Sequence, residues 1–200
     1  MKKIYLSQII ICLFFTNVSH GQEVDQYLEK ATSSYASGDL HETRYALQET
    51  LHQIDMAIGA EILKILPESM GKYSYQEIED NTTSAGYAGL FVNRSYIGDT
   101  ETHSAAIQVM GDSPLLSGIT ALLSLPMITG DSNQKRIRIG SYRALMEKNE
   151  DDMGYVSWNV QVPMGNTLLT FECRGNETES EVTEMLSLLQ LEQIAQLTKK

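Results

Sequence analysis

Apolar residues recur every three or four positions between residues 40 and 66, a spacing that places them on one face of an α-helix. They form a single stripe, which consists of Leu47, Leu51, Ile54, Ile58, Ile62 and Ile65. A first helix is expected over Gln22–Ser37, and the turn Ser37–Gly38–Asp39 separates the two helices, with Asp39 as a candidate N-cap. Pro67 ends the second helix. Residues 22–66 are therefore predicted to form an antiparallel helical hairpin.

Beyond Pro67 the pattern changes to the two-residue alternation that is typical of strands. The alternating runs are Lys72–Ile78, Tyr87–Ile97, His103–Met110, Lys135–Met146, Tyr155–Val162 and Asn166–Cys173. Short turns at 98–101 and 163–166 join two pairs of these runs as hairpins, and strands joined by short turns are antiparallel. Thr178 and Glu181 have the spacing of a capping box for a closing helix. The prediction is an α+β fold over residues 67–200, with an antiparallel sheet of about five or six strands packed by helices.

Residues 113–130 are an apolar stretch without a charged side chain. Pro114 suits the first turn of a helix, and Pro126 stops that helix after about three turns, which is too short to span a membrane. A helix lying on a membrane surface would carry basic residues on its polar face, and this stretch has none. We expect a buried helix across the sheet. A cavity between this helix and the sheet would give an alternative function, the carriage of an apolar ligand.

The N-terminus has the pattern of a secretory signal peptide. Lys2 and Lys3 form a positive start, residues 4–15 are apolar, and Ser19 and Gly21 are small residues before a cleavage site at Gln22. The apolar run is shorter than the roughly 20 residues of a spanning helix. Cys12 lies inside the run and follows three isoleucines, so it does not fit a lipoprotein processing site. The sequence predicts a signal peptide at 1–21 and a periplasmic or secreted mature protein.

The predicted mature chain is strongly acidic. Removal of residues 1–21 takes away Lys2 and Lys3, which leaves 13 basic and 26 acidic side chains and a formal charge of −13. This balance argues against a nucleic acid or an anionic membrane surface as the partner. Cys173 is then the only cysteine, so no intrachain disulfide forms. Its parity with Leu169 and Phe171 predicts a buried strand residue.

Arg94 is the main candidate for ligand binding. It shares strand parity with Leu90, Val92 and Tyr96, and a charge on an apolar face requires a partner or an opening to solvent. One interpretation is an anchor for an anion or a carboxylate, formed together with Arg138 and Tyr142 from another strand. The other interpretation is a structural ion pair.

Motifs for catalysis and metal binding are missing from the sequence. It contains no Gly-x-Ser-x-Gly, no His-Glu-x-x-His and no phosphate-binding glycine loop. Glu49 and His52 form one Glu-x-x-His, whereas a di-iron bundle uses two copies with further carboxylates. We therefore assign no catalytic residue, metal ligand or cofactor, and we favour a protein that is not an enzyme.

The stretch Ala31–Leu51 resembles one tetratricopeptide-type helical hairpin. The similarity rests on Tyr35, Gly38, Asp39, Leu40, Ala46 and Leu51. One such unit cannot bury its own apolar face, because stable arrays need about three repeats. The hairpin is therefore expected to pack on the rest of the chain or on a partner.

Three further motifs extend the resemblance to the whole mature chain. They are Ile65–Leu66–Pro67, Asp112–Ser113–Pro114–Leu115–Leu116 and Ile139–Gly140–Ser141–Tyr142–Arg143–Ala144. Through them the chain resembles a group of uncharacterised exported proteins of Gram-negative bacteria, and its order of elements is similar to that of small PsbP-like domains. The glycine–tryptophan pair usual after the long helix is here Gly71–Lys72–Tyr73. The resemblance implies export and the fold, and it transfers no site residue.

The leading functional hypothesis is a non-enzymatic exported module that binds a protein or a small ligand. It rests on the predicted export, the unpaired hairpin and the missing catalytic motifs. The alternatives are the apolar-ligand carrier described above and an enzyme with an unrecognised site near Arg94.

Overall fold

The computed structural model describes residues 20–84, 89–100, 102–125, 133–152 and 154–199. Its helices are α1 (His20–Ala36), α2 (Leu40–Ile65), α3 (Leu116–Ser124), α4 (Glu179–Ser187) and α5 (Leu191–Leu197), with a 3₁₀ turn η1 (Glu77–Glu79). Its strands are β1 (Ser69–Met70), β2 (Tyr73–Tyr75), β3 (Asn81–Ser84), β4 (Leu90–Ile97), β5 (Ser104–Gly111), β6 (Gln134–Ile139), β7 (Tyr142–Glu150), β8 (Val156–Met164) and β9 (Thr167–Arg174). The predicted signal peptide lies almost entirely outside the described residues.

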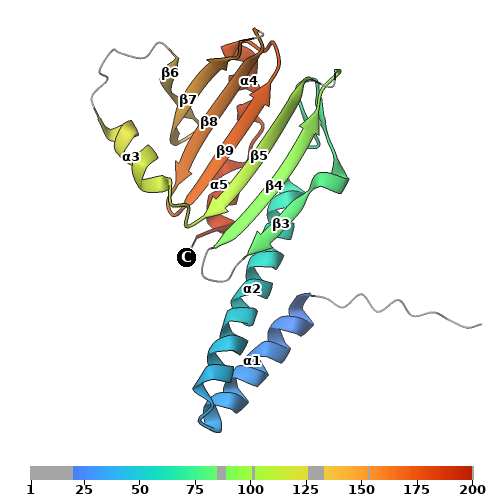
Figure 1. The fold of residues 1–200 in the computed structure, drawn as a ribbon, viewed down its shortest axis with the longest axis vertical. Helices are drawn as coiled ribbons and strands as arrows, with labels where there is room; N and C mark the ends of the chain where they lie inside the picture. Colours follow the sequence, from blue (N-terminus) through green and yellow to red (C-terminus); the bar gives the residue numbers. More distant parts are fainter. Residues whose placement is uncertain (1–19, 85–88, 101, 126–132, 153, 200) are drawn as a thin grey trace, which may run out of the picture.

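The strands form one antiparallel sheet in the order β1-β2-β4-β5-β9-β8-β7-β6, with β3 paired to β4 beside β2. Figure 1 shows this sheet preceded by the pair of helices α1 and α2. The predicted α+β class, the antiparallel sheet and the N-terminal helical hairpin are confirmed. The predicted size of the sheet was too small, because the described residues contain nine strands rather than five or six.

Compared with the six predicted runs there are three additional strands, one of which is β1, paired with β2. Two local features account for the other two. The run 135–146 was predicted as one strand, but it folds back at Gly140, where φ is +57°, and so forms both β6 and β7. Residues 81–84, predicted as part of a polar loop, pair with β4 as the strand β3. The strands β1, β2 and β3 have only two to four residues, which is too short for an alternating pattern to emerge.

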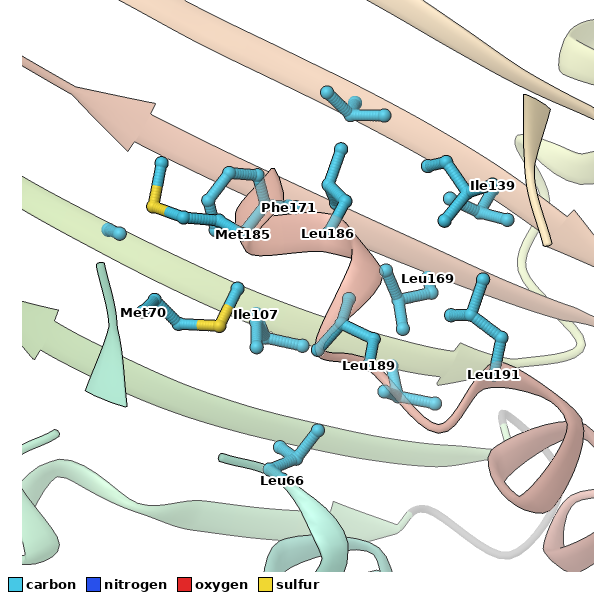
Figure 2. Close-up of a cluster of buried hydrophobic side chains, with 14 of the residues drawn as sticks. Leu66, Met70, Ile107, Ile139, Leu169, Phe171, Met185, Leu186, Leu189 and Leu191 are labelled. Carbon is cyan, nitrogen blue, oxygen red and sulfur yellow. The ribbon is translucent and has the colours of Figure 1, made fainter. Parts of the chain in front are cut away.

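One face of the sheet carries the hydrophobic core. The C-terminal half of α2 packs on it together with α4 and α5, which lie behind the sheet in Figure 1. Figure 2 shows side chains from the strands, among them Ile107, Leu169 and Phe171, facing Leu186 and Leu189 from the C-terminal segment. The capping box predicted at Thr178 and Glu181 starts α4 and so directs this helix onto the core.

The opposite face of the sheet is largely open, and α3 covers only its β7 and β8 side. Ile119 and Leu123 of α3 pack on Leu145, whereas Leu122 and Leu125 keep 41 % and 51 % of their surface exposed. The prediction of a buried helix was therefore wrong for most of α3, in which only Ile119 and Leu123 are buried. Residues 126–130 of the predicted helix lie outside the described residues. Among the described helices, none combines the length and the apolar character needed to cross a bilayer.

Candidate functional site

Arg94 lies on the core face of β4 and is 6 % exposed. Its Nε donates to Oδ1 of Asp80 at 2.9 Å, and its Nη1 donates to the carbonyl oxygen of Leu66 at 2.9 Å. The guanidinium also lies over the ring of Tyr75, with Cζ 4.6 Å from the centroid. Arg94 thus ties the C-terminal end of α2 to the sheet, which is the geometry of a structural ion pair. A role in ligand binding stays a prediction.

The other two predicted ligand-binding residues lie at the opposite edge of the sheet. Arg138 is exposed on β6, where its Nη2 donates to the carbonyl oxygen of Ser141. Tyr142, at the start of β7, is half-buried against the core. Because β5, β9 and β8 separate β4 from β7, the structure does not bring Arg94 together with Arg138 and Tyr142.

Cys173 is buried on the core face of β9, as the alternation predicted. Its Sγ lies 3.5 Å from Oη of Tyr73 and 3.6 Å from Oε2 of Glu177. Burial raises the pKa of the Cys173 thiol to about 12. The thiol is therefore protonated at neutral pH, and this state does not suit a nucleophile.

Glu177, beside this thiol, has a side chain that is only 5 % exposed, and its Oε1 lies 2.8 Å from the Lys72 ammonium. Burial raises the pKa of this carboxyl, but Lys72 and the Tyr73 hydroxyl lower it more, so the pKa lies below the usual 4.5. A depressed pKa in the folded state stabilises the fold above the unfolded-state pKa. That contribution is lost as the pH falls through the folded-state pKa.

Glu177→Gln is therefore expected to be less stable than the wild type at pH 7, and the difference should shrink below about pH 4.5. Urea unfolding at several pH values between 7 and 3 measures this difference. Glu184→Gln, on an exposed position of α4, serves as the control and should stay close to the wild type throughout. A stability difference for Glu177→Gln that stays constant down to pH 3 would contradict the lowered pKa of Glu177 in the folded state.

The C-terminal part of the apolar stripe of α2 belongs to the core. Ile62 is fully buried against the sheet, and Ile58 and Ile65 are half-buried at its border. Helix α1 covers a different face of α2, where Ala46 and Thr50 are buried. The stripe that packs on the sheet is therefore not the face that packs on α1.

Towards its N-terminus α2 extends past the end of the sheet (Figure 1). There the side chains of the same stripe become exposed. Leu47, Leu51 and Ile54 keep 46 %, 53 % and 39 % of their surface accessible. Leu40, seven residues before Leu47 and hence on the same face, is 66 % exposed. We call Leu40, Leu47, Leu51 and Ile54 the hairpin stripe. Neighbouring large apolar side chains on a surface usually have a partner, so the hairpin stripe is a candidate interaction site.

Helix α1 adds two apolar side chains on the same side. Lys30 of α1 contacts Glu42 and the ring of Tyr45, which lie on the flank of α2 opposite the hairpin stripe. Helical periodicity places Leu28 and Tyr35 on the flank of α1 away from Lys30. These two side chains are 44 % and 69 % exposed. Together with the hairpin stripe they form one surface, which we call the hairpin surface.

The hairpin as a whole carries an excess of acidic side chains, although the basic residue Arg44 lies on the same helix face as Leu40 and Leu47. Residues 20–66 contain eight acidic and three basic side chains. Two of the three basic side chains, Lys30 and Lys64, are paired with glutamates of the same hairpin. The hairpin thus combines an apolar strip with an excess of negative charge.

The open face of the sheet also carries a shallow trough of about 610 Å³ over β4, β5, β9 and β8. Its lining combines the small side chains Ser95, Ser104, Ala106 and Ser157 with charged side chains, namely Glu79, Glu172 and Arg174. The Arg94 side chain points to the other face of β4 and does not contribute. Arg174 is already paired with Asp151, and Glu172 accepts a hydrogen bond from Asn159. We therefore take the hairpin surface as the stronger candidate.

Sequence reasoning identified Leu47, Leu51 and Ile54 as part of an apolar stripe but did not tell which part of it is exposed. It did not identify Leu28 and Tyr35 as members of the surface. The sequence feature that could have pointed to Leu28 and Tyr35 is the lack of a second repeat unit, which leaves one side of the hairpin without cover.

Comparison of the chain with models of protein families, with curated proteins and with solved structures finds no match.

Proposed function

We propose that this protein is an exported binding module without catalytic activity, and that its hairpin surface docks an amphipathic segment of a protein partner. The observation that carries the proposal is the hairpin stripe, where the apolar face of α2 continues past the sheet and stays exposed. Burying a large aliphatic side chain stabilises a complex by roughly 1.5–3 kcal/mol, so even a half-exposed stripe offers useful binding energy.

The chemistry of the hairpin defines the partner. An exposed helix face with apolar residues at intervals of three, four and seven fits the apolar face of a second helix. The eight carboxylates of residues 20–66 favour a segment whose flanks are basic, because complementary charges speed association and fix orientation. The proposed partner segment is therefore helical, apolar on one face and rich in lysine or arginine beside that face.

A synthetic amphipathic peptide of leucine and lysine should bind the mature protein, and its leucine–glutamate counterpart should not. The double variant Leu47→Glu with Leu51→Glu is expected to weaken binding of the leucine–lysine peptide at least tenfold, because it places charges in the apolar contact. Fluorescence anisotropy with labelled peptide measures both affinities. Added salt should weaken the wild-type complex.

Ile78→Glu provides the matched control, because Ile78 is an apolar residue that is 95 % exposed on η1, outside the hairpin. This variant should bind the peptide as the wild type does. Equal binding by the hairpin variant and the wild type, or equal binding of the two peptides, would refute the proposed function.

A further inference from the structure

A second surface of this acidic chain carries basic side chains, in contrast to the acidic hairpin. Arg136, Arg138 and Arg143 lie on the open face of β6 and β7, next to α3. Arg136 donates from Nη1 to the carbonyl oxygen of Leu125, which ties this strand to the end of the helix. Figure 1 shows α3 along this side of the sheet. We call the three arginines with the exposed Leu122 and Leu125 the α3–β6 patch.

The arginines of this patch are arranged unfavourably for an isolated chain. Arg138 and Arg143 face each other directly as cross-strand partners, and like charges in such a pair repel. Within the described ranges, none of the three arginines forms an ion pair with a carboxylate. A partner that brings apolar and acidic groups would relieve this repulsion.

We propose that the partner of the α3–β6 patch is the hairpin surface of a second copy of this chain. The proposal rests on the proposed function, since it names one occupant of the hairpin surface. Leu122 and Leu125 supply apolar contact for the hairpin stripe, and the arginines supply the basic flank that the acidic hairpin favours.

The fold allows this contact between two molecules but not within one molecule. Helix α2 is continuous from Leu40 to Ile65 and packs on β3 and β4, whereas β6 is the strand at the opposite edge of the sheet. One hairpin therefore does not reach its own patch. Two different surfaces then meet in each contact, which is a heterologous interface, and repetition of that interface gives rings or open chains.

The size of the hairpin surface sets the strength of the contact. At 1.5 Å per residue, the stretch from Leu40 to Ile54 is about 21 Å long, and two helices of about 10 Å width give roughly 400 Å² of contact on each partner, or roughly 800 Å² in total. Stable interfaces bury about 1,200–2,000 Å² in total, so self-association should be weak and reversible.

Sedimentation velocity of the mature protein tests the proposal. The mean mass of the wild type should rise with protein concentration and fall when salt is added, because charge pairs contribute to the contact. The hairpin variant, Leu47→Glu with Leu51→Glu, and a patch variant, Arg138→Glu with Arg143→Glu, should each stay monomeric. An equimolar mixture of the two should form a 1:1 dimer and nothing larger, because it retains one intact interface.

The other outcomes are equally informative. A wild type that stays monomeric up to millimolar concentration refutes the second copy as occupant and does not depend on the folding of any variant. Self-association that persists in the patch variant shows that hairpins pair with each other, and also overturns the proposal. If the wild type is monomeric but binds the leucine–lysine peptide, the proposed function stands and only the self-contact fails.

Discussion

Replacement of Arg94 by methionine is expected to lower the free energy of unfolding by about 3–5 kcal/mol, the usual effect of breaking a buried ion pair. The variant leaves the Asp80 carboxylate, whose side chain is only 14 % exposed, without its guanidinium. It also leaves the carbonyl oxygen of Leu66 without the Nη1 donor. Methionine fills much of the space, so the loss reports the missing charge and hydrogen bonds. Urea unfolding at pH 7 measures it.

A matched control is available in Arg174, whose ion pair with Asp151 is exposed to solvent on both sides. Arg174→Met should change the free energy of unfolding by at most about 1 kcal/mol. Adding Asp80→Leu to Arg94→Met should recover a large part of the stability, because it removes the orphaned charge. A loss below about 1 kcal/mol for Arg94→Met would show that the pair is not a structural tie.

For Arg94 the sequence pattern predicts the face of the strand but not the partner of the side chain. Alternation placed this arginine correctly on the face of β4 that also carries Val92 and Tyr96. Its partner Asp80 follows the short turn η1, and no period connects the two positions. The two interpretations of Arg94 therefore could not be separated from the sequence, because only the folded chain brings Asp80 and Leu66 to it.

Elements with their own local signals were predictable. Asp39 caps α2 through its side chain, and the alternation of β4, β5, β8 and β9 was long enough to define the central strands. The strand β3 gave no such signal, since its residues are all polar and its pairing to β4 depends on a distant segment. Gly59 of α2 lies against Thr82 of β3 without room for a Cβ atom, a contact that is equally invisible to a local pattern.

The sequence pattern of the hairpin surface likewise does not show which distant element covers it. A stripe with a spacing of three and four residues indicates a helix face that needs cover, but it does not tell which element covers each part. In α2 the sheet covers the C-terminal part around Ile62, and the N-terminal part around Leu47 stays exposed. The difference follows from where the sheet ends along the helix. It is a property of tertiary structure.

Phe171→Ala is expected to have the second large effect, a loss of about 3–5 kcal/mol in the free energy of unfolding. Phe171 is fully buried in the middle strand β9, where Ile107 of β5 and Val160 of β8 are its cross-strand neighbours. Figure 2 shows its ring facing the helical layer near Met185. Removing the ring leaves a cavity between sheet and helices, which the well-packed surroundings do not fill by relaxation. Urea unfolding provides the measurement.

Phe91→Ala is the matched control for this prediction, because Phe91 lies on the open face of β4 and is only half-buried. The same truncation there removes less buried surface and should lower stability by about 1–2 kcal/mol. The two variants thus compare the two faces of one sheet with the same chemical change. If they lost equal stability, the open face would be packed as tightly as the core face. A one-sided core, in contrast, requires the loss at Phe171 to be clearly larger than the loss at Phe91.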